Sequence, residues 1–168
     1  MATLRLPILT WATVPDASGN VFFEKLDVKA TNDVWDRMVC IFNDTSTRLG
    51  LAGGFTVPKN YVGNAKLVVV WTSTATTGTA VFDFDYRAIS GNDTESLDQT
   101  GTQETVTGSD VAPGAAMRRL EVLISLTSAN LAADDEVEFE FFRDGTDGSE
   151  TLAAAVIVFN LLLEYTDV

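Results

Sequence analysis

Three stretches of this chain alternate between apolar and polar residues, and this period of two constrains the fold more than any other sequence feature. In "TAVFDFDYRA", the aromatic residues Phe82, Phe84 and Tyr86 share one face. Residues 118–127 and 135–144 alternate in the same way. Such alternation predicts β-strands with one buried face and one wet face. Strands of this kind are typical of antiparallel sheets.

About nine short strands fit into the 168 residues, and turns rich in Gly, Asn, Asp and Thr separate them. Helical patterns are nearly absent, although "LTSANL" allows one short helical turn. We predict a single domain over residues 1–168, an all-β antiparallel β-sandwich of the jelly-roll type with about eight to nine strands. Residues 1–20 are a candidate extended N-terminal arm. The expected strands lie at 3–9, 20–28, 37–43, 66–73, 79–88, 103–107, 118–127, 135–144 and 153–165.

The last expected strand differs from the others because it is apolar on both faces. In "AAAVIVFNLLLEY", strict alternation places Ile157 and Leu161 on one face, and Val156, Val158 and Leu162 on the other. A two-sheet sandwich covers only the inner face of each sheet, and exposed apolar patches often mark partner sites. We therefore predict a subunit interface at Val156, Val158 and Leu162. The alternative is that a loop covers this face.

The acidic charge and the residues that are missing exclude several function classes. The net charge is -13, and there is no His. A surface of this charge repels phosphate, so we predict neither nucleic-acid nor membrane partners. Without His, the commonest general base and metal ligand are absent. The single Cys40 lies in the apolar run "RMVCIFN" and is expected to be buried and unreactive. No signal peptide or membrane-spanning stretch is predicted.

The carboxylate patterns are only weak signals for catalysis or metal binding. Asp83 and Asp85 share one face of a strand and could serve acid–base or glycosidase chemistry, but the neighbouring Arg87 favours a solvated face. "RDGTDGSE" lacks the spacing of a calcium loop and is better explained as a tight connection through Asp144 and Asp147. We predict no catalytic residues, no cofactor and no metal ligands, and a weak calcium site stays open as an alternative.

Aromatic residues offer a second kind of site, a platform for a sugar ring. Trp11, Trp35 and Tyr61 are the candidates, because Trp71 follows the apolar run "LVVV" and is expected in the core. An aromatic residue in a β-sandwich is a packing residue first, and it supports binding only when it is exposed.

Residues 57–168 resemble a class of virion proteins of tailed bacteriophages. The resemblance rests on "VPKNYVGNAKLVVVWTSTATTGTAVFDFDYRAI", on "SLDQTGTQETVTGSDVAPGAAMRRLEVLISLTSANLAADDEVEFEFFRD" and on "AAVIVFNLLLEYTDV". It implies a jelly-roll domain that assembles as a homotrimer and decorates or cements the outside of a capsid. No catalytic residues come with it.

On this reading, the chain is a non-enzymatic virion protein that binds the major capsid protein, after synthesis in the host cytoplasm. Binding only the assembled lattice would stabilise that lattice. Residues 1–20 are the candidate capsid contact, through Leu4, Leu6, Ile8 and Trp11. The alternative function is a receptor- or carbohydrate-binding module of a tail or fibre. An enzyme using Asp83 and Asp85 ranks last.

Overall fold

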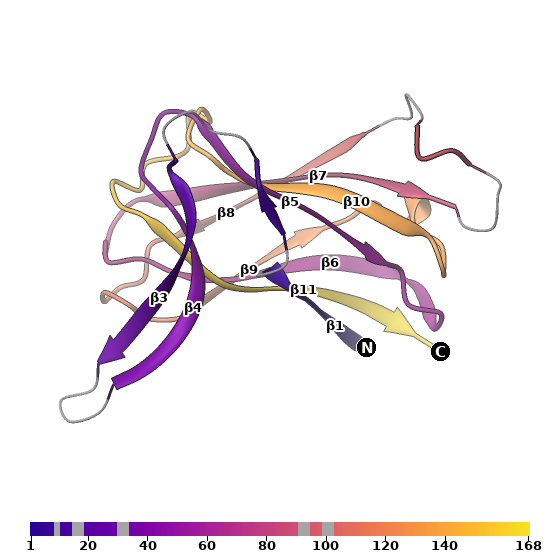
Figure 1. Ribbon diagram of the computed structural model, residues 1–168, viewed down its shortest axis with the longest axis horizontal. Coiled ribbons are helices and arrows are strands. Elements are labelled where there is room, and N and C mark those ends of the chain that lie inside the picture. Colours follow the sequence, from indigo (N-terminus) through magenta and orange to yellow (C-terminus); the bar gives the residue numbers. More distant parts are fainter. Residues whose placement is uncertain (9–10, 15–18, 30–33, 91–94, 99–102) are drawn as a thin grey trace.

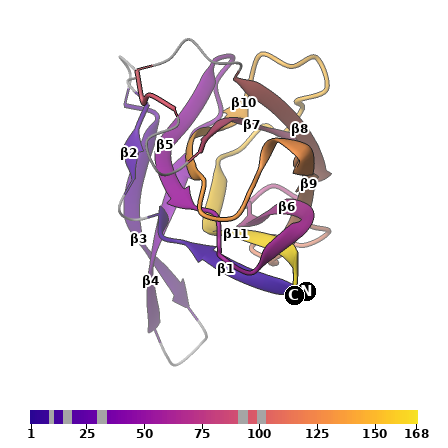
Figure 2. The same ribbon diagram turned by 90° about the vertical axis from the view of Figure 1, so that its right-hand side faces the viewer.

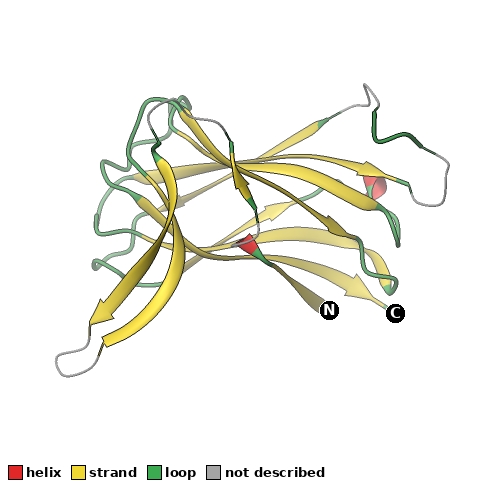
Figure 3. Ribbon diagram, viewed as in Figure 1, coloured by secondary structure: helices red, strands yellow, loops and turns green. Residues whose placement is uncertain are grey.

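The computed structural model describes residues 1–8, 11–14, 19–29, 34–90, 95–98 and 103–168. Two antiparallel sheets pack face to face in a β-sandwich (Figure 1, Figure 3). The predicted all-β antiparallel sandwich is therefore confirmed. Eleven strands are present in the described residues, at β1 Ala2–Leu6, β2 Ala12–Thr13, β3 Val21–Lys29, β4 Val34–Phe42, β5 Arg48–Thr56, β6 Tyr61–Thr72, β7 Thr79–Ile89, β8 Glu104–Val111, β9 Leu120–Ser125, β10 Glu136–Asp144 and β11 Val156–Asp167.

Sheet A has six strands in the order β3-β4-β11-β6-β9, and β1 also pairs with β11. Sheet B has five strands in the order β2-β5-β10-β7-β8. Figure 2 looks at the sandwich from one end and shows the two termini side by side. There the amino group of Met1 lies 2.9 Å from the Asp167 carboxylate.

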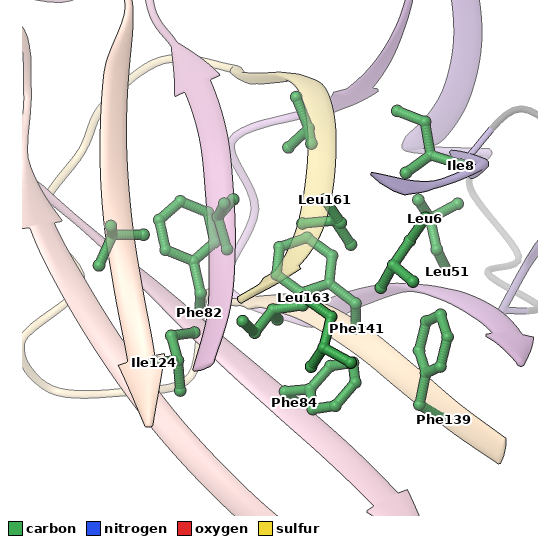
Figure 4. Close-up of a cluster of buried hydrophobic side chains, with 14 of the residues drawn as sticks. Leu6, Ile8, Leu51, Phe82, Phe84, Ile124, Phe139, Phe141, Leu161 and Leu163 are labelled. Atoms are coloured by element: carbon green, nitrogen blue, oxygen red, sulfur yellow. The ribbon is translucent and has the colours of Figure 1, made fainter. Parts of the chain in front are cut away.

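The core lies between the sheets and consists of the inward-facing residues that the alternation predicts. On β7, Phe82, Phe84 and Tyr86 are all buried. Phe82 stacks on Phe141 of β10 with a ring-centroid distance of 5.8 Å. Leu163 of sheet A lies against these rings (Figure 4). Aromatic pairs at such distances add to the free energy gained from the burial of their surface.

Strand β5 was not predicted, because its "GLAGG" stretch reads as a loop. Glycine weakens a strand, but it is found where another group approaches the backbone closely. A Cβ atom on Gly50 would lie 2.5 Å from the Phe142 ring, and one on Gly53 would lie 2.7 Å from the Trp11 ring. The two aromatic rings therefore occupy the space that side chains would fill, and β5 pairs with β10 along its whole length.

The predicted faces of β11 are wrong for Val156 and Val158, because the strand contains an irregularity. Val158 pairs with Trp71 and Asn160 pairs with Val70, so Phe159 is an extra residue in β11. An extra residue of this kind reverses the side-chain alternation beyond it. Val156 and Val158 therefore lie in the core together with Leu161, Leu163 and Tyr165.

The described residues of the N-terminus form strands of both sheets, so the extended arm is wrong for them. β1 pairs with β11, and β2 pairs with β5. Leu6, Ile8 and Trp11 are buried in the core, and Leu4 is partly buried against it. Burial removes Leu6, Ile8 and Trp11 as surface contacts. Residues 9–10 and 15–18 of the predicted arm lie outside the described residues.

Two turns and the buried cysteine agree with the predictions from the sequence. Residues Ser128–Asn130 form a 3-10 turn, as "LTSANL" predicts. The carboxylate of Asp144 accepts hydrogen bonds from the backbone and the hydroxyl of Thr146, which makes the segment after β10 a tight turn. Cys40 is fully buried, as expected.

Candidate functional site

Strand β11 changes its neighbour halfway along its length. β4 pairs with β11 as far as Val158, whereas β1 pairs with it from Leu161 onward. Figure 1 shows β4 toward one end of β11 and β1 toward the other. Phe159 and Asn160 lie in the gap between the two partners. The extra residue in β11 is therefore located where this edge of the strand has no paired neighbour among the described residues.

A groove of about 480 Å³ opens at this gap. Its volume is in the range of small-molecule sites. Arginine, amide and aromatic groups lie beside aliphatic ones in its lining. The residues that line it are Arg5, Leu6, Pro7, Ile8, Asp36, Arg37, Met38, Phe159 and Asn160. We call this surface the β11 groove.

The polar groups of the β11 groove are held by specific contacts. Arg5 donates a hydrogen bond from Nη2 to Oδ1 of Asn160 over 2.5 Å. The Cζ atom of Arg37 lies 4.8 Å from the centroid of the half-buried Phe159 ring. A guanidinium over a ring keeps N–H donors in its own plane. The groove therefore combines an aromatic ring with several hydrogen-bond donors and the acceptor of an amide.

The charge of the β11 groove is opposite to that of the chain. Among the residues that the structure describes, neither Arg5 nor Arg37 forms an ion pair with a carboxylate. Asp36 lies 3.3 Å from Lys25, so a second cation offsets its charge. The groove thus carries two guanidiniums in a protein whose net charge is -13.

A second hollow, of about 370 Å³, lies on the outer face of sheet B. Internal ion pairs engage three of its charged groups. Arg87 donates from Nε to Glu138 over 2.7 Å. Arg48 donates from Nη1 and Nη2 to the two oxygens of Asp85, each over 2.9 Å. The exposed Glu140 also lines this hollow, so its remaining charge is negative.

Asp83 and Asp85 share one face of β7, as predicted, but they do not form a solvated face. Their exposed fractions are 6% and 5%. Nε of Arg48 donates to Asp83 over 3.0 Å, and the Thr107 hydroxyl donates to its other oxygen over 2.7 Å. Desolvation lowers the pKa of Arg48, but its hydrogen bonds and attraction to Asp85 and Asp83 outweigh desolvation and raise it. These contacts hold both carboxylates, so neither is free to act as a nucleophile or a base.

The residues predicted from the sequence do not gather at one site. Of the predicted interface residues, Leu162 alone lies on the outer face of sheet A, where it is half-buried and pairs with Val68. The prediction that Trp11 and Tyr61 form a platform for a sugar ring is wrong, since both residues are buried. Trp35 lies in β4, but its side chain is outside the described part of the chain.

The residues of the β11 groove were not predicted from the sequence as a site. Arg5, Arg37 and Phe159 come from three strands that are distant in the sequence. Asn160 was the one available signal, because it interrupts the apolar run "VIVFNLLL". A polar residue within an apolar strand must find a partner, and here Arg5 is that partner.

The described residues contain no helix long and apolar enough to cross a membrane. Within the same part of the chain, no group of three or more acidic or Cys side chains could hold a metal ion.

Solved structures of similar fold include carbohydrate-binding modules. The match to CBM35 from Paenibacillus barcinonensis has a TM-score of 0.58 at 12% identity and covers 99% of this chain and 100% of that chain. A family 35 carbohydrate-binding module from Clostridium thermocellum matches with a TM-score of 0.55 at 13% identity and the same coverage. A family 30 carbohydrate-binding module has a TM-score of 0.53 at 12% identity, again covering 99% and 100%. No family model and no curated protein matches the sequence. At these identities the likeness shows the fold alone, and it confirms the jelly-roll type.

Proposed function

We propose that the chain is a non-catalytic carbohydrate-binding module whose ligand site is the β11 groove. The observation that carries the proposal is the extra residue in β11, which places Phe159 and Asn160 beside Arg5 and Arg37. Irregularities of this kind often re-aim a side chain beside a functional site.

The chemistry of the groove suits a sugar. Phe159 is half-buried and Arg37 lies over its ring, so the exposed part of the ring offers an apolar surface to the C–H groups of a pyranose. The Asn160 amide and the two guanidiniums offer planar, paired donors and acceptors, which match neighbouring hydroxyl groups. A few polar groups in a mostly apolar hollow are the usual composition of a small-molecule site.

The fold supports the same function class. Domains with this fold include modules named for carbohydrate binding. A fold hosts many functions, so the groove and not the fold carries the proposal. The non-catalytic part of the proposal is supported by Arg48, which pairs with both Asp83 and Asp85.

Affinity electrophoresis in gels that contain soluble polysaccharides tests the proposal, together with a glycan array to find the preferred sugar. We expect retardation by at least one polysaccharide and loss of retardation in Phe159→Ala and Asn160→Ala. Leu123→Ala is the matched control, because Leu123 is an exposed apolar residue of sheet A outside the groove. Thermal unfolding shows whether each variant is folded. If no carbohydrate binds, or if Phe159→Ala binds like the parent protein, the proposal is wrong.

A second candidate function is the trimeric virion protein, bound to the major capsid protein on the outer surface of a capsid. The observation that favours it is an apolar row across the outer face of sheet A, where Leu162 pairs with Val68 and Val68 with Leu123. Leu123 is 51% exposed. Light scattering that gives the mass of a trimer, lost in a Leu123→Asp variant, would support it. A monomer would count against it, although a carbohydrate-binding module of a phage tail or fibre would remain compatible with that result.

A further inference from the structure

We propose that the β11 groove selects sugars that carry an anionic group, a carboxylate or a sulfate ester, over neutral sugars. The inference rests on the proposed function and adds the ligand class. It comes from the two guanidiniums of the groove, Arg5 and Arg37, which line the same hollow from β1 and from β4.

Both guanidiniums keep their charge available to a ligand. Arg5 donates to a neutral amide, and Arg37 lies over an aromatic ring. Neither partner is a carboxylate, so neither contact neutralises the positive charge. Both residues are exposed at the rim of the groove. An anion that enters the groove would form charge-assisted hydrogen bonds, which are about twice as strong as neutral ones.

Most of the other arginines of the protein have an acidic partner. Arg48, Arg87, Arg119 and Arg143 each pair with at least one acidic side chain. The exposed Arg118 has no such partner among the described residues, but it lies apart from Arg5 and Arg37 and does not line the groove. Arg5 and Arg37 face one hollow without an acidic partner in the described part of the chain, and they leave a local positive site on a negative protein.

The one carboxylate of the groove does not cancel this charge. Asp36 lies 3.3 Å from the ammonium group of Lys25 in the neighbouring strand β3. Among the lining residues, Arg5 and Arg37 outnumber Asp36, so the lining carries a surplus of positive charge. Arginine also matches the planar geometry of a carboxylate, because its fork can donate two parallel hydrogen bonds.

The ring of Phe159 explains why the expected anion is carried by a sugar and is not a free inorganic ion. A small ion would contact the guanidiniums but would not cover the exposed parts of Phe159 and Met38. A pyranose that carries a charged substituent would cover the apolar side of the groove and reach the arginines at once. The ligand then uses both halves of the lining.

The test compares ligands with one backbone and different charge. Isothermal titration calorimetry measures binding of an oligogalacturonate, of its methyl ester and of a sulfated galactose oligosaccharide. We expect the oligogalacturonate or the sulfated sugar to bind about tenfold more tightly than the ester at low salt, with the preference falling as salt is added. The two anionic ligands distinguish a carboxylate from a sulfate as the recognised group.

Three variants locate the effect. Arg37→Gln and Arg5→Gln should each remove most of the preference for the anionic ligand. Arg119→Gln is the control, since it removes the same charge from an exposed residue that pairs with Glu121 outside the groove. If the control loses the preference equally, the effect is one of net charge and the inference is wrong.

The remaining outcomes separate this inference from the proposed function. If the acid and the ester bind equally, and Phe159→Ala abolishes both, the preference for anions is wrong while carbohydrate binding stands. If no sugar of any charge binds, both proposals fail together. If inorganic sulfate alone binds as tightly as the anionic sugars, the claim that the groove recognises the sugar ring together with the anion is wrong.

Discussion

Arg143 and Glu150 form an ion pair inside the protein. Nη2 of Arg143 donates to Oε1 of Glu150 over 2.9 Å, and the exposed fractions of the two side chains are 1% and 6%. Asp44 lies 3.3 Å from the same nitrogen. The guanidinium also donates to four backbone carbonyls, at Phe42, Asn43, Leu152 and Ala154. One buried cation thus joins the end of β4 to the segment between β10 and β11.

Replacing Arg143 by Met should destabilise the protein strongly. The variant removes the cation beside Glu150, which keeps only backbone donors, and it leaves several carbonyl groups without their donor. Breaking a buried pair in this way costs about 3–5 kcal/mol of unfolding free energy. Urea denaturation measures the loss. Arg119→Gln is the control, since the change of an exposed residue should stay within about 0.5 kcal/mol. A loss below about 1 kcal/mol for Arg143→Met would contradict the structural role of this cation.

The glycines of β5 give a prediction about packing. In Gly53→Ala, the added Cβ atom would lie 2.7 Å from the Trp11 ring, so the ring must move. We expect a loss of about 1–3 kcal/mol of unfolding free energy, the usual effect of overpacking a core. The same change at Gly148, where no atom lies within 4 Å of an added Cβ, should have little effect. Equal stability of the two variants would show that Trp11 does not depend on Gly53.

The outline of the fold could be predicted from the sequence because alternation reports burial directly. β9 and β10 follow their pattern, and the inner residues of β7 are buried as predicted, although its outward Asp83 and Asp85 are buried as well. β5 could not be predicted, because its glycines carry no pattern and the rings that fill their space belong to distant parts of the chain. Hydrophobic alternation predicts a strand only when the side chains of that strand themselves alternate between apolar and polar.

The candidate site could not be predicted for a different reason. One extra residue at Phe159 reverses the alternation in β11, and no local signal in "VIVFNLLL" indicates where the pairing partner changes. Strict alternation therefore placed Val156 and Val158 on the wrong face. The groove needs Arg5 and Arg37 as well, and only the pairing of β1 and β4 with one strand brings these residues together.

Cys40 should be unreactive in the folded protein. Burial disfavours the thiolate and raises the pKa of this thiol to about 12. The thiolate is the reactive form, so iodoacetamide should not modify the native protein at neutral pH, while the unfolded protein should react readily. Mass spectrometry after a timed exposure with and without urea measures this difference. Rapid modification without urea would show that the strands around Cys40 open often.

Glu104 accepts three hydrogen bonds at the edge of sheet B. The Tyr86 hydroxyl donates to Oε2 over 2.6 Å, the Asn130 amide donates to the same oxygen over 2.8 Å, and the Thr127 hydroxyl donates to Oε1. Burial acts to raise the pKa of Glu104, but the three hydrogen bonds outweigh it and lower the pKa below the ordinary value. The ionised form is therefore favoured in the folded state.

The stability of the protein should depend on the ionisation of Glu104 in mildly acidic solution. Because its pKa is lower in the folded state, Glu104 stabilises the protein fully above the ordinary carboxyl pKa of about 4.3. This contribution is lost as the pH falls from there through the lower pKa of the folded state. In Glu104→Gln, the unfolding free energy from urea titrations should fall less steeply across that window than in the parent protein. Glu140→Gln, which removes one exposed carboxylate of the same sheet, is the matched control for the loss of a charge. If Glu104→Gln shows the same slope as the parent, its hydrogen bonds do not distinguish the ionised from the neutral carboxyl.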